Sequence, residues 1–331
     1  MTRPAGPEAS LPDAATRAAA IYPEDWLGSW QWQGHTVSYV GSVPEPVASS
    51  GPRPVLLIHG FGACKEHWRH NLPQLATRRP AFAIDLIGFG ASSKPPSRLD
   101  GEPEDGRALR YSVDLWADQV AGFVREVIGT PVQLVGNSIG GVVALAAAVR
   151  LQETVGQVIL IDCAQRSLDD RRLSEQPPLR RVGRPLLKQL VRQRWLTGRL
   201  FRWLASPGVV RRVLAIAYPS GGGLDDQLVQ MLLTPTLSPG AEESFRGFIN
   251  LFRDHLAPDL LAETSVPVRL LWGEADPWEP VAEARRWAVA FPGVRDLRIL
   301  PGLGHCPHDE NPALVNPVLE EWLAQGDQAG A

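Results

Sequence analysis

The stretch from Gly136 to Gly140, Gly-Asn-Ser-Ile-Gly, has residue types and spacing that suit nucleophilic catalysis. An apolar run ends at Val135 and an alanine-rich helical pattern follows, so this G-x-S-x-G spacing falls at a strand–turn–helix junction. The turn would force Ser138 into a strained backbone conformation, and a side chain at 136 or 140 would collide with the approaching chain. The helix N-terminus that follows favours developing negative charge. We therefore predict that Ser138 is a nucleophile rather than a simple helix cap.

A serine hydroxyl needs a base at neutral pH, and His305 is the expected one among the seven histidines. His305 follows the last expected strand in a loop flanked by glycine, at the sheet edge from which Ser138 should also emerge. His308 is its rival, but Asp309 and Glu310 beside it indicate a position in solvent. The sequence thus favours His305 as the general base.

Asp276 is the expected acid of the same site, because it follows a late strand that ends near Gly273. Its carboxylate would hold the imidazole in one tautomer and stabilise its charged form. Glu274 is a near rival, and Asp162, after the preceding strand, is another; an Asx turn is the alternative role for Asp276. The order serine, aspartate, histidine along the chain is the one this architecture uses.

A glycine-rich turn closes an early strand within 56–63 and is expected to supply a backbone N–H for an oxyanion. We nominate the amides of Phe61 and Ile139 as the two donors. His59 is expected to be a structural hydrogen-bonding residue rather than a base. A phosphate-binding turn is disfavoured because no Gly-Lys-Ser/Thr or G-x-G-x-x-G follows. The residues expected to support the turns are His59, Gly60, Gly62, Gly136 and Gly140.

Three cysteines, Cys64, Cys163 and Cys306, are too few and too scattered for a disulfide framework or a zinc site. Each follows a turn or strand end near the expected site. Small buried hydrophobic residues are the favoured interpretation. Modification of a thiol that gates activity is the competing hypothesis.

These residues require a scaffold, and the apolar pattern predicts one. Short continuous apolar runs, typical of strands buried on both faces, lie at 55–59, 82–85, 132–135, 158–162, 268–273 and 297–300, after two shorter strands within 29–40. Helical patterns separate them at 65–76, 112–128, 138–150, 281–291 and 312–324. This alternation predicts an α/β fold with a doubly wound, mostly parallel sheet, whose strand ends form the ligand crevice.

The alternation stops after the sixth strand, where 166–262 is expected to form an inserted helical cap. Within it, 166–212 holds 13 Arg and Lys residues against three acidic residues, with tryptophan and leucine interleaved. A solvated helical surface explains this pattern, and so does a face for an anionic membrane or an acidic substrate. The core is then 21–165 with 263–326, and 1–20 is expected to be a flexible arm.

Composition limits the remaining functions. A hydrophobic content of 44% and a charged content of 21% are typical of a globular protein. A net charge of −3 argues against general nucleic-acid binding, and no apolar run reaches the roughly 18–20 residues of a membrane span. We expect a cytoplasmic protein, with peripheral contact to an internal membrane left open.

The quoted motifs resemble the α/β-hydrolase superfamily over about 30–325. The stretches 57–71, 83–95, 136–140 and 304–309 are similar to the chlorophyll dephytylase and pheophytinase-like group of photosynthetic organisms. This resemblance implies hydrolysis of the phytyl ester of a chlorophyll-type pigment without metal or cofactor. It also implies Ser138 as nucleophile, His305 as base and Asp276 as acid, and a cap that sets substrate specificity.

The sequence therefore predicts a serine hydrolase of a small-molecule or lipid-like carboxylic ester. Two alternatives stay open. One is a perhydrolase or C–C bond hydrolase that uses the same three residues. The other is a noncatalytic binder that docks membranes or partners through its basic cap.

Overall fold

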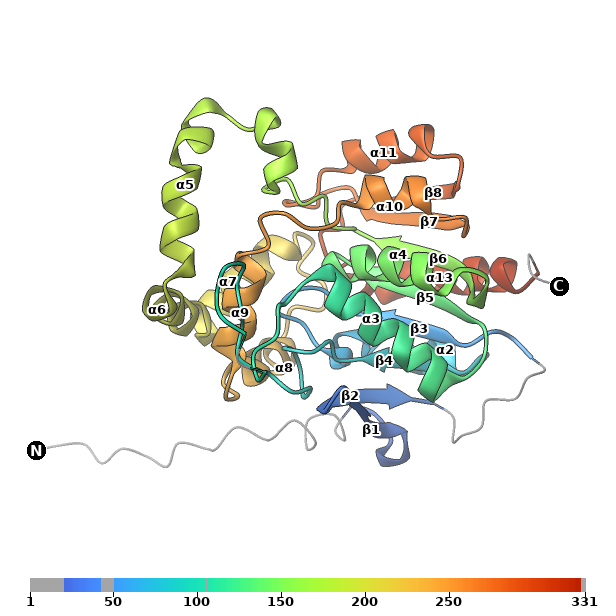
Figure 1. The fold of residues 1–331 in the computed structure, drawn as a ribbon. Helices are drawn as coiled ribbons and strands as arrows, with labels where there is room; N and C mark the ends of the chain where they lie inside the picture. The colour runs from blue at the N-terminus through green and yellow to red at the C-terminus, as the bar shows by residue number, and fades with distance from the viewer. Residues whose placement is uncertain (1–20, 43–50, 105, 329–331) are drawn as a thin grey trace, which may run out of the picture.

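A single mixed sheet forms the centre of the protein (Figure 1). The structure is a computed structural model that describes residues 21–42, 51–104 and 106–328. The strand order is β1-β2-β4-β3-β5-β6-β7-β8. β1 and β2 pair antiparallel, as do β2 and β4, and all other neighbours are parallel. The strands are β1 Leu27–Trp32, β2 His35–Gly41, β3 Val55–Ile58, β4 Ala81–Ile84, β5 Val132–Asn137, β6 Val155–Ile161, β7 Val268–Gly273 and β8 Val294–Leu300. The prediction of a doubly wound, mostly parallel sheet is confirmed; the expected arm 1–20 lies outside the described residues.

Helices cover both faces of the sheet because its central strands, β3 to β7, are almost entirely buried. One face packs against α3 (Val113–Phe123), α4 (Ile139–Leu151), α10 (Ala257–Glu263) and α11 (Val281–Ala290). The other face packs against α2 (Leu72–Ala76) and α13 (Pro312–Gln328). The two apolar clusters hold the parallel strands between them, so the carboxyl ends of β3, β5, β6 and β7 are fixed relative to one another.

The helical insertion follows the sixth strand, as predicted. It contains α5 (Pro178–Arg192), α6 (Arg194–Leu204), α7 (Pro207–Ala217), α8 (Asp226–Thr236) and α9 (Ala241–Ile249). α5 stands apart from the sheet at the side of the molecule (Figure 1). α10, which begins within 166–262 and ends at Glu263, instead packs on α4 through Leu260 and Leu261. We propose that the cap comprises 166–262. Its helices α5 to α9 lie away from the sheet.

A third apolar cluster joins the insertion to the core. It combines Leu214, Tyr218 and Leu228 of the insertion with Cys64 and Cys306 of the core. The loops that follow β3 and β8 are therefore covered by α7 and α8. Among the residues that the structure describes, no helix is both long enough and apolar enough to cross a bilayer.

Candidate active site

Ser138 sits where β5 runs directly into α4. Its φ is +56°, a left-handed conformation that costs a non-glycine residue of order 1–3 kcal/mol. The tight turn explains the two flanking glycines: a Cβ on Gly136 would lie 2.2 Å from the Gly140 carbonyl oxygen, and a Cβ on Gly140 would lie 2.4 Å from that of Ile58. Ser138 itself is half-buried, so its hydroxyl stands at a position that solvent can reach.

His305 and Asp276 meet beside this turn. The Nδ1 atom of His305 and the Oδ2 atom of Asp276 are 2.7 Å apart. The other carboxylate oxygen of Asp276 accepts the N–H groups of Trp278 at 2.8 Å and Glu279 at 3.1 Å. Because Nδ1 is engaged by the carboxylate, Nε2 is the ring nitrogen left for another partner.

Hydrogen bonds to the backbone of His305 connect its loop to the serine turn and to the insertion. The side-chain amide of Asn137, the residue before Ser138, donates to the carbonyl of His305 at 3.0 Å. The His305 N–H donates to the carbonyl of Ala217, the last residue of α7, at 2.9 Å. Position 305 is thus fixed from the core on one side and from the insertion on the other.

The rival carboxyl groups occupy different surroundings. Glu274 is exposed. Asp162 is fully buried at the end of β6 with a φ of +43°, and its Oδ1 atom accepts the N–H of Gly273 at 2.9 Å. Only Asp276 among the three makes a hydrogen bond to His305 within the described residues.

Electrostatics separates Asp276 from two acidic neighbours. Burial alone would raise the pKa of Asp276, but the hydrogen bond and charge of His305 and the N–H groups of Trp278 and Glu279 outweigh it and lower the pKa. Burial and the charge of Asp276 raise the pKa of Asp162 well above its usual value. Burial likewise raises the pKa of Glu279 to about 8. At neutral pH Glu279 is therefore protonated beside Asp276, and burial also favours the neutral form of Asp162.

The glycine turn after β3 lies against Ser138: a Cβ on Gly60 would be 3.1 Å from the Ser138 Cβ. The amides of Phe61 and Ile139 donate to no other group in the described part of the chain. Ile139 is the first residue of α4, where an N–H has no intrahelical acceptor. Both donors nominated from the sequence are thus available near the serine.

His59 stabilises this turn through two hydrogen bonds of its ring. Its Nε2 accepts the N–H of Leu86 at 3.1 Å, so its Nδ1 carries the proton and donates to the Gly60 carbonyl at 2.7 Å. Burial lowers the pKa of His59 and keeps the ring neutral. A buried ion pair that the motifs did not reveal, Lys65 Nζ to Asp85 Oδ2 at 2.9 Å, stabilises the same turn.

The expectation of a solvent position for His308 is wrong. His308, Asp309 and Glu310 are all buried. Residues distant in sequence explain this: Arg69 pairs with Asp309 at 2.8 Å, and Glu310 accepts the N–H of Gly304 at 2.6 Å. No local pattern signals those partners, yet Glu310 positions the backbone directly before His305.

The three cysteines are free and buried, as the favoured interpretation requires. Burial raises the pKa of each thiol well above its usual value. A protonated, enclosed thiol is a poor nucleophile, so the described geometry favours packing over modification at Cys64, Cys163 and Cys306.

An apolar pocket of about 340 Å³, its open mouth included, begins at the glycine turn. Aromatic rings dominate its wall, and the Phe61 ring stacks on Phe248 with 3.8 Å between centroids. The lining residues are Phe61, Gly62, Ala63, Gly88, Phe89, Gly90, Lys94, Phe201, Pro235, Thr236, Ala241, Ser244 and Phe245. Ser138 and His305 are not among the lining residues; the pocket is next to the serine turn through Phe61 and Gly62, and its lining suits an apolar group.

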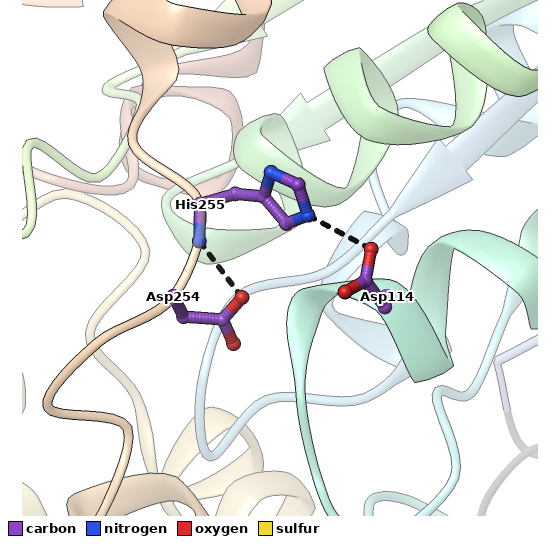
Figure 2. Close-up of side chains that lie close together, drawn as sticks. All are labelled: Asp114, Asp254 and His255. Atoms are coloured by element: carbon purple, nitrogen blue, oxygen red, sulfur yellow. Dashed lines mark hydrogen bonds and ion pairs between the residues drawn. The ribbon is translucent and has the colours of Figure 1, made fainter.

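A separate polar cluster lies at the start of α3 and close to α10, where Asp114, Asp254 and His255 come close enough to share a metal ion (Figure 2). Their ligand atoms already have partners: His255 Nε2 and Asp114 Oδ1 are 2.8 Å apart, Arg150 pairs with Asp114, and Asp254 accepts the N–H of Val113 at 2.9 Å. These contacts join α3, α4 and the segment before α10, which is a structural role.

Known proteins of similar sequence or fold include several hydrolases. The profile of the alpha/beta hydrolase family matches residues 55–318. The chain is 29% identical to the chloroplastic pheophytinase of Arabidopsis thaliana over 301 residues, covering 83% of this chain but only 62% of pheophytinase. It is 26% identical to the 2-hydroxymuconate semialdehyde hydrolase of Pseudomonas sp. (strain CF600), covering 83% and 88% of the two chains. A bacterial membrane phospholipase A superimposes with a TM-score of 0.68 at 25% identity, covering 95% and 91%.

Proposed function

Because the chain belongs to the alpha/beta hydrolase family, we propose that it is a serine hydrolase that cleaves a carboxylic ester through an acyl-enzyme intermediate. The observation that carries the proposal is the 2.7 Å hydrogen bond between His305 Nδ1 and Asp276 Oδ2, on a loop tied to the residue before Ser138. It gives an oriented imidazole whose second nitrogen is free for a serine proton.

In the proposed reaction His305 takes the proton of Ser138 as the hydroxyl oxygen attacks the ester carbonyl. The negative charge that develops on the carbonyl oxygen is stabilised by the amides of Phe61 and Ile139. His305 then gives its proton to the departing alkoxide, and an alcohol leaves. Water, activated by the same imidazole, releases the acid from Ser138. Asp276 stays ionised throughout and stabilises the charged imidazole.

The substrate we propose is an ester with a long apolar group, and the phytyl ester of a chlorophyll-type pigment is one example. The apolar pocket at Phe61 supports this class, since each buried methylene contributes about 0.8 kcal/mol to binding. The similarity to a pheophytinase and to a membrane phospholipase A supports it as well. The expected membrane contact of 166–212 would suit this substrate class, because such esters reside in membranes.

The direct test is hydrolysis of a short p-nitrophenyl ester by Ser138→Ala, with a far-ultraviolet circular dichroism spectrum to verify the fold. We expect turnover to fall at least about 10⁴-fold with an unchanged spectrum. Retained turnover would refute Ser138 as the nucleophile. Incubation with pheophytin and chlorophyll, followed by chromatography, then tests the phytyl ester: release of free phytol supports it, and intact pigment excludes it.

A C–C bond hydrolase is the second candidate, favoured by the similarity to a 2-hydroxymuconate semialdehyde hydrolase. It would use the same serine and histidine on a vinylogous diketone. Cleavage of a meta-cleavage product at a higher kcat/KM than any ester would replace the ester proposal. The remaining alternatives are a perhydrolase, detected by peroxide-dependent halogenation, and a noncatalytic binder.

A further inference from the structure

Helix α5 turns its apolar side outward. Val182, Leu186 and Leu190 are spaced four residues apart, so they align along one side of the helix. Their exposed fractions are 80%, 61% and 43%. A surface helix of a globular protein normally buries such a stripe against the core. On α5 the stripe has no partner within the described residues.

The basic side of α5 faces the protein instead. Arg184 and Lys188, two residues out of step with the apolar stripe, lie over the ring of Phe252 at 4.5 and 5.1 Å. Both also pair with Asp170. These inward contacts fix how the helix is rotated, so the outward apolar stripe is a consequence of the packing.

Exposed apolar side chains are also present on the next two helices. Trp195 and Trp203 of α6 are 64% and 62% exposed, and Val213 and Ile216 of α7 are also exposed. We call this surface the cap face; it comprises Val182, Leu186, Leu187, Leu190, Trp195, Leu200, Trp203, Val213 and Ile216. Nine of the 15 large hydrophobic side chains that are exposed in the described residues thus belong to one run of three helices, which indicates an interaction surface rather than scattered exposure.

The charge around the cap face has one sign. Residues 178–217 contain ten Arg and Lys residues and no Asp or Glu. Arg199, Arg202 and Arg212 are exposed, and none of them forms an ion pair with a described residue. The apolar side chains are therefore accompanied by cationic groups that are free to meet an external anion.

This charge decides between possible occupants. A second copy of the chain docked through the same face would bring two strongly cationic surfaces together, which is unfavourable. A bilayer with anionic lipids offers both an apolar interior and negative headgroups, and tryptophan side chains favour that interface. We propose that the cap face binds peripherally to membranes that contain anionic lipids.

The inner side of α6 links this surface to the pocket. Phe201 of α6 lines the apolar pocket together with Phe61 and Phe245. A lipid-like ester leaving the bilayer at the cap face would need to pass only one helix to reach the glycine turn. This consequence rests on the proposed hydrolase function, whereas membrane binding itself does not.

The test measures binding of the full chain to sedimented vesicles of phosphatidylcholine, with and without about 30 mol% phosphatidylglycerol. We expect at least about tenfold tighter binding to the anionic vesicles, weakened by added salt. The double variants L186S/L190S and W195A/W203A should each lose at least about tenfold in binding. R199Q/R202Q should lose most of the preference for phosphatidylglycerol.

Matched controls lie on α11 and just beyond it. Val289→Ser removes an apolar side chain that is even more exposed, and R285Q/R295Q removes the same charge at exposed positions away from the cap face. Both should bind as the native chain does. Vesicle binding that is absent, insensitive to the cap-face variants or equally reduced in the controls would overturn the proposal. Self-association abolished by W195A/W203A, without vesicle binding, would assign the face to a second copy instead.

The two proposals can fail separately. Ser138→Ala should still sediment with anionic vesicles, because the serine is not on the cap face. The cap-face variants should keep the native kcat/KM for a soluble p-nitrophenyl ester. Loss of docking with retained hydrolysis therefore addresses only the membrane proposal.

Discussion

Two helices, α4 and α5, use their apolar residues in opposite ways. α4 begins after Ser138, and almost all of its side chains are buried between the sheet, α3 and α10. In α5 the arrangement is reversed: the basic side chain of Arg184 faces the protein, and the apolar side chain of Leu186 faces outward. Internal packing thus explains the shape of the catalytic end of the sheet. The internal contacts of α5 set its rotation but leave its apolar side exposed, which is the basis for the proposed membrane contact.

The largest expected effect concerns the acid at the catalytic end. Asp276→Asn should lower kcat for ester hydrolysis about 10³- to 10⁴-fold, because the amide cannot stabilise the charged imidazole and favours the wrong tautomer. Asp162→Asn is the matched variant: burial raises the pKa of this acid, and it makes no hydrogen bond to His305, so kcat should fall less than about tenfold. Steady-state kinetics of the pair would contradict the assignment if Asp162→Asn were the more damaging.

A second pair of variants compares how closely the backbone is packed at α4 and at α5. Gly140→Ala should lower the free energy of unfolding by about 3 kcal/mol or more, because its Cβ would lie 2.4 Å from a backbone carbonyl. Gly183→Ala in α5 meets no atom within 4 Å and should raise it by about 0.5–1 kcal/mol. Urea denaturation measures both. Equal effects would remove the distinction between the regions.

The neutral acid beside Asp276 predicts a pH dependence of stability. The folded-state pKa of Glu279, about 8, lies above its ordinary value of 4.5. Between these values the folded protein holds a proton that the unfolded chain has lost, so stability from this group falls as pH rises from about 5 to about 8. A pKa difference of this size corresponds to a loss of about 5 kcal/mol in the free energy of unfolding. Because the Glu279 side chain is partly exposed, we expect a loss of about 2 kcal/mol.

Glu279→Gln should flatten this slope, since the amide does not titrate. Unfolding free energies at pH 5, 6.5 and 8 give the measurement, with Glu274→Gln as the control at an exposed position. Asp162 acts in the same direction in all three proteins, so the difference isolates Glu279. An unchanged slope in Glu279→Gln would show that this carboxyl is ionised when folded.

The smallest effect is expected on the cap face. L186S/L190S should change the free energy of unfolding by less than about 0.5 kcal/mol, because both side chains are already in water. Leu145→Ala in α4, a fully buried leucine, should cost about 2–5 kcal/mol. A large loss in the double serine variant would mean that α5 packs against the protein through these residues.

Apolar periodicity predicted the core elements closely because the central strands are buried on both faces. The strand 268–273 was predicted to the residue, whereas the expected helix 112–128 divides into α3 and a π-helical turn, Val124–Ile128. Long-range partners account for what the sequence did not predict. The charges of Asp309 and Glu310 suggested solvent, since nothing local indicated Arg69 or the Gly304 amide.

The same limit applies to the site and to α5. The spacing left Asp276, Glu274 and Asp162 as alternatives, and only the direction of the carboxylates relative to His305 distinguishes them. The basic, leucine-containing pattern of 166–212 predicted a helical surface but not which side of α5 faces the core. That side is set by Asp170 and Phe252, which come from other parts of the chain.

The reaction of the folded protein with a fluorophosphonate probe, followed by peptide mass spectrometry, tests the central claim most directly. A serine activated by His305 should form a stoichiometric covalent adduct on the peptide that contains Ser138, and His305→Ala should abolish it. Absence of an adduct on the native protein, or an adduct on a different serine, would contradict the account.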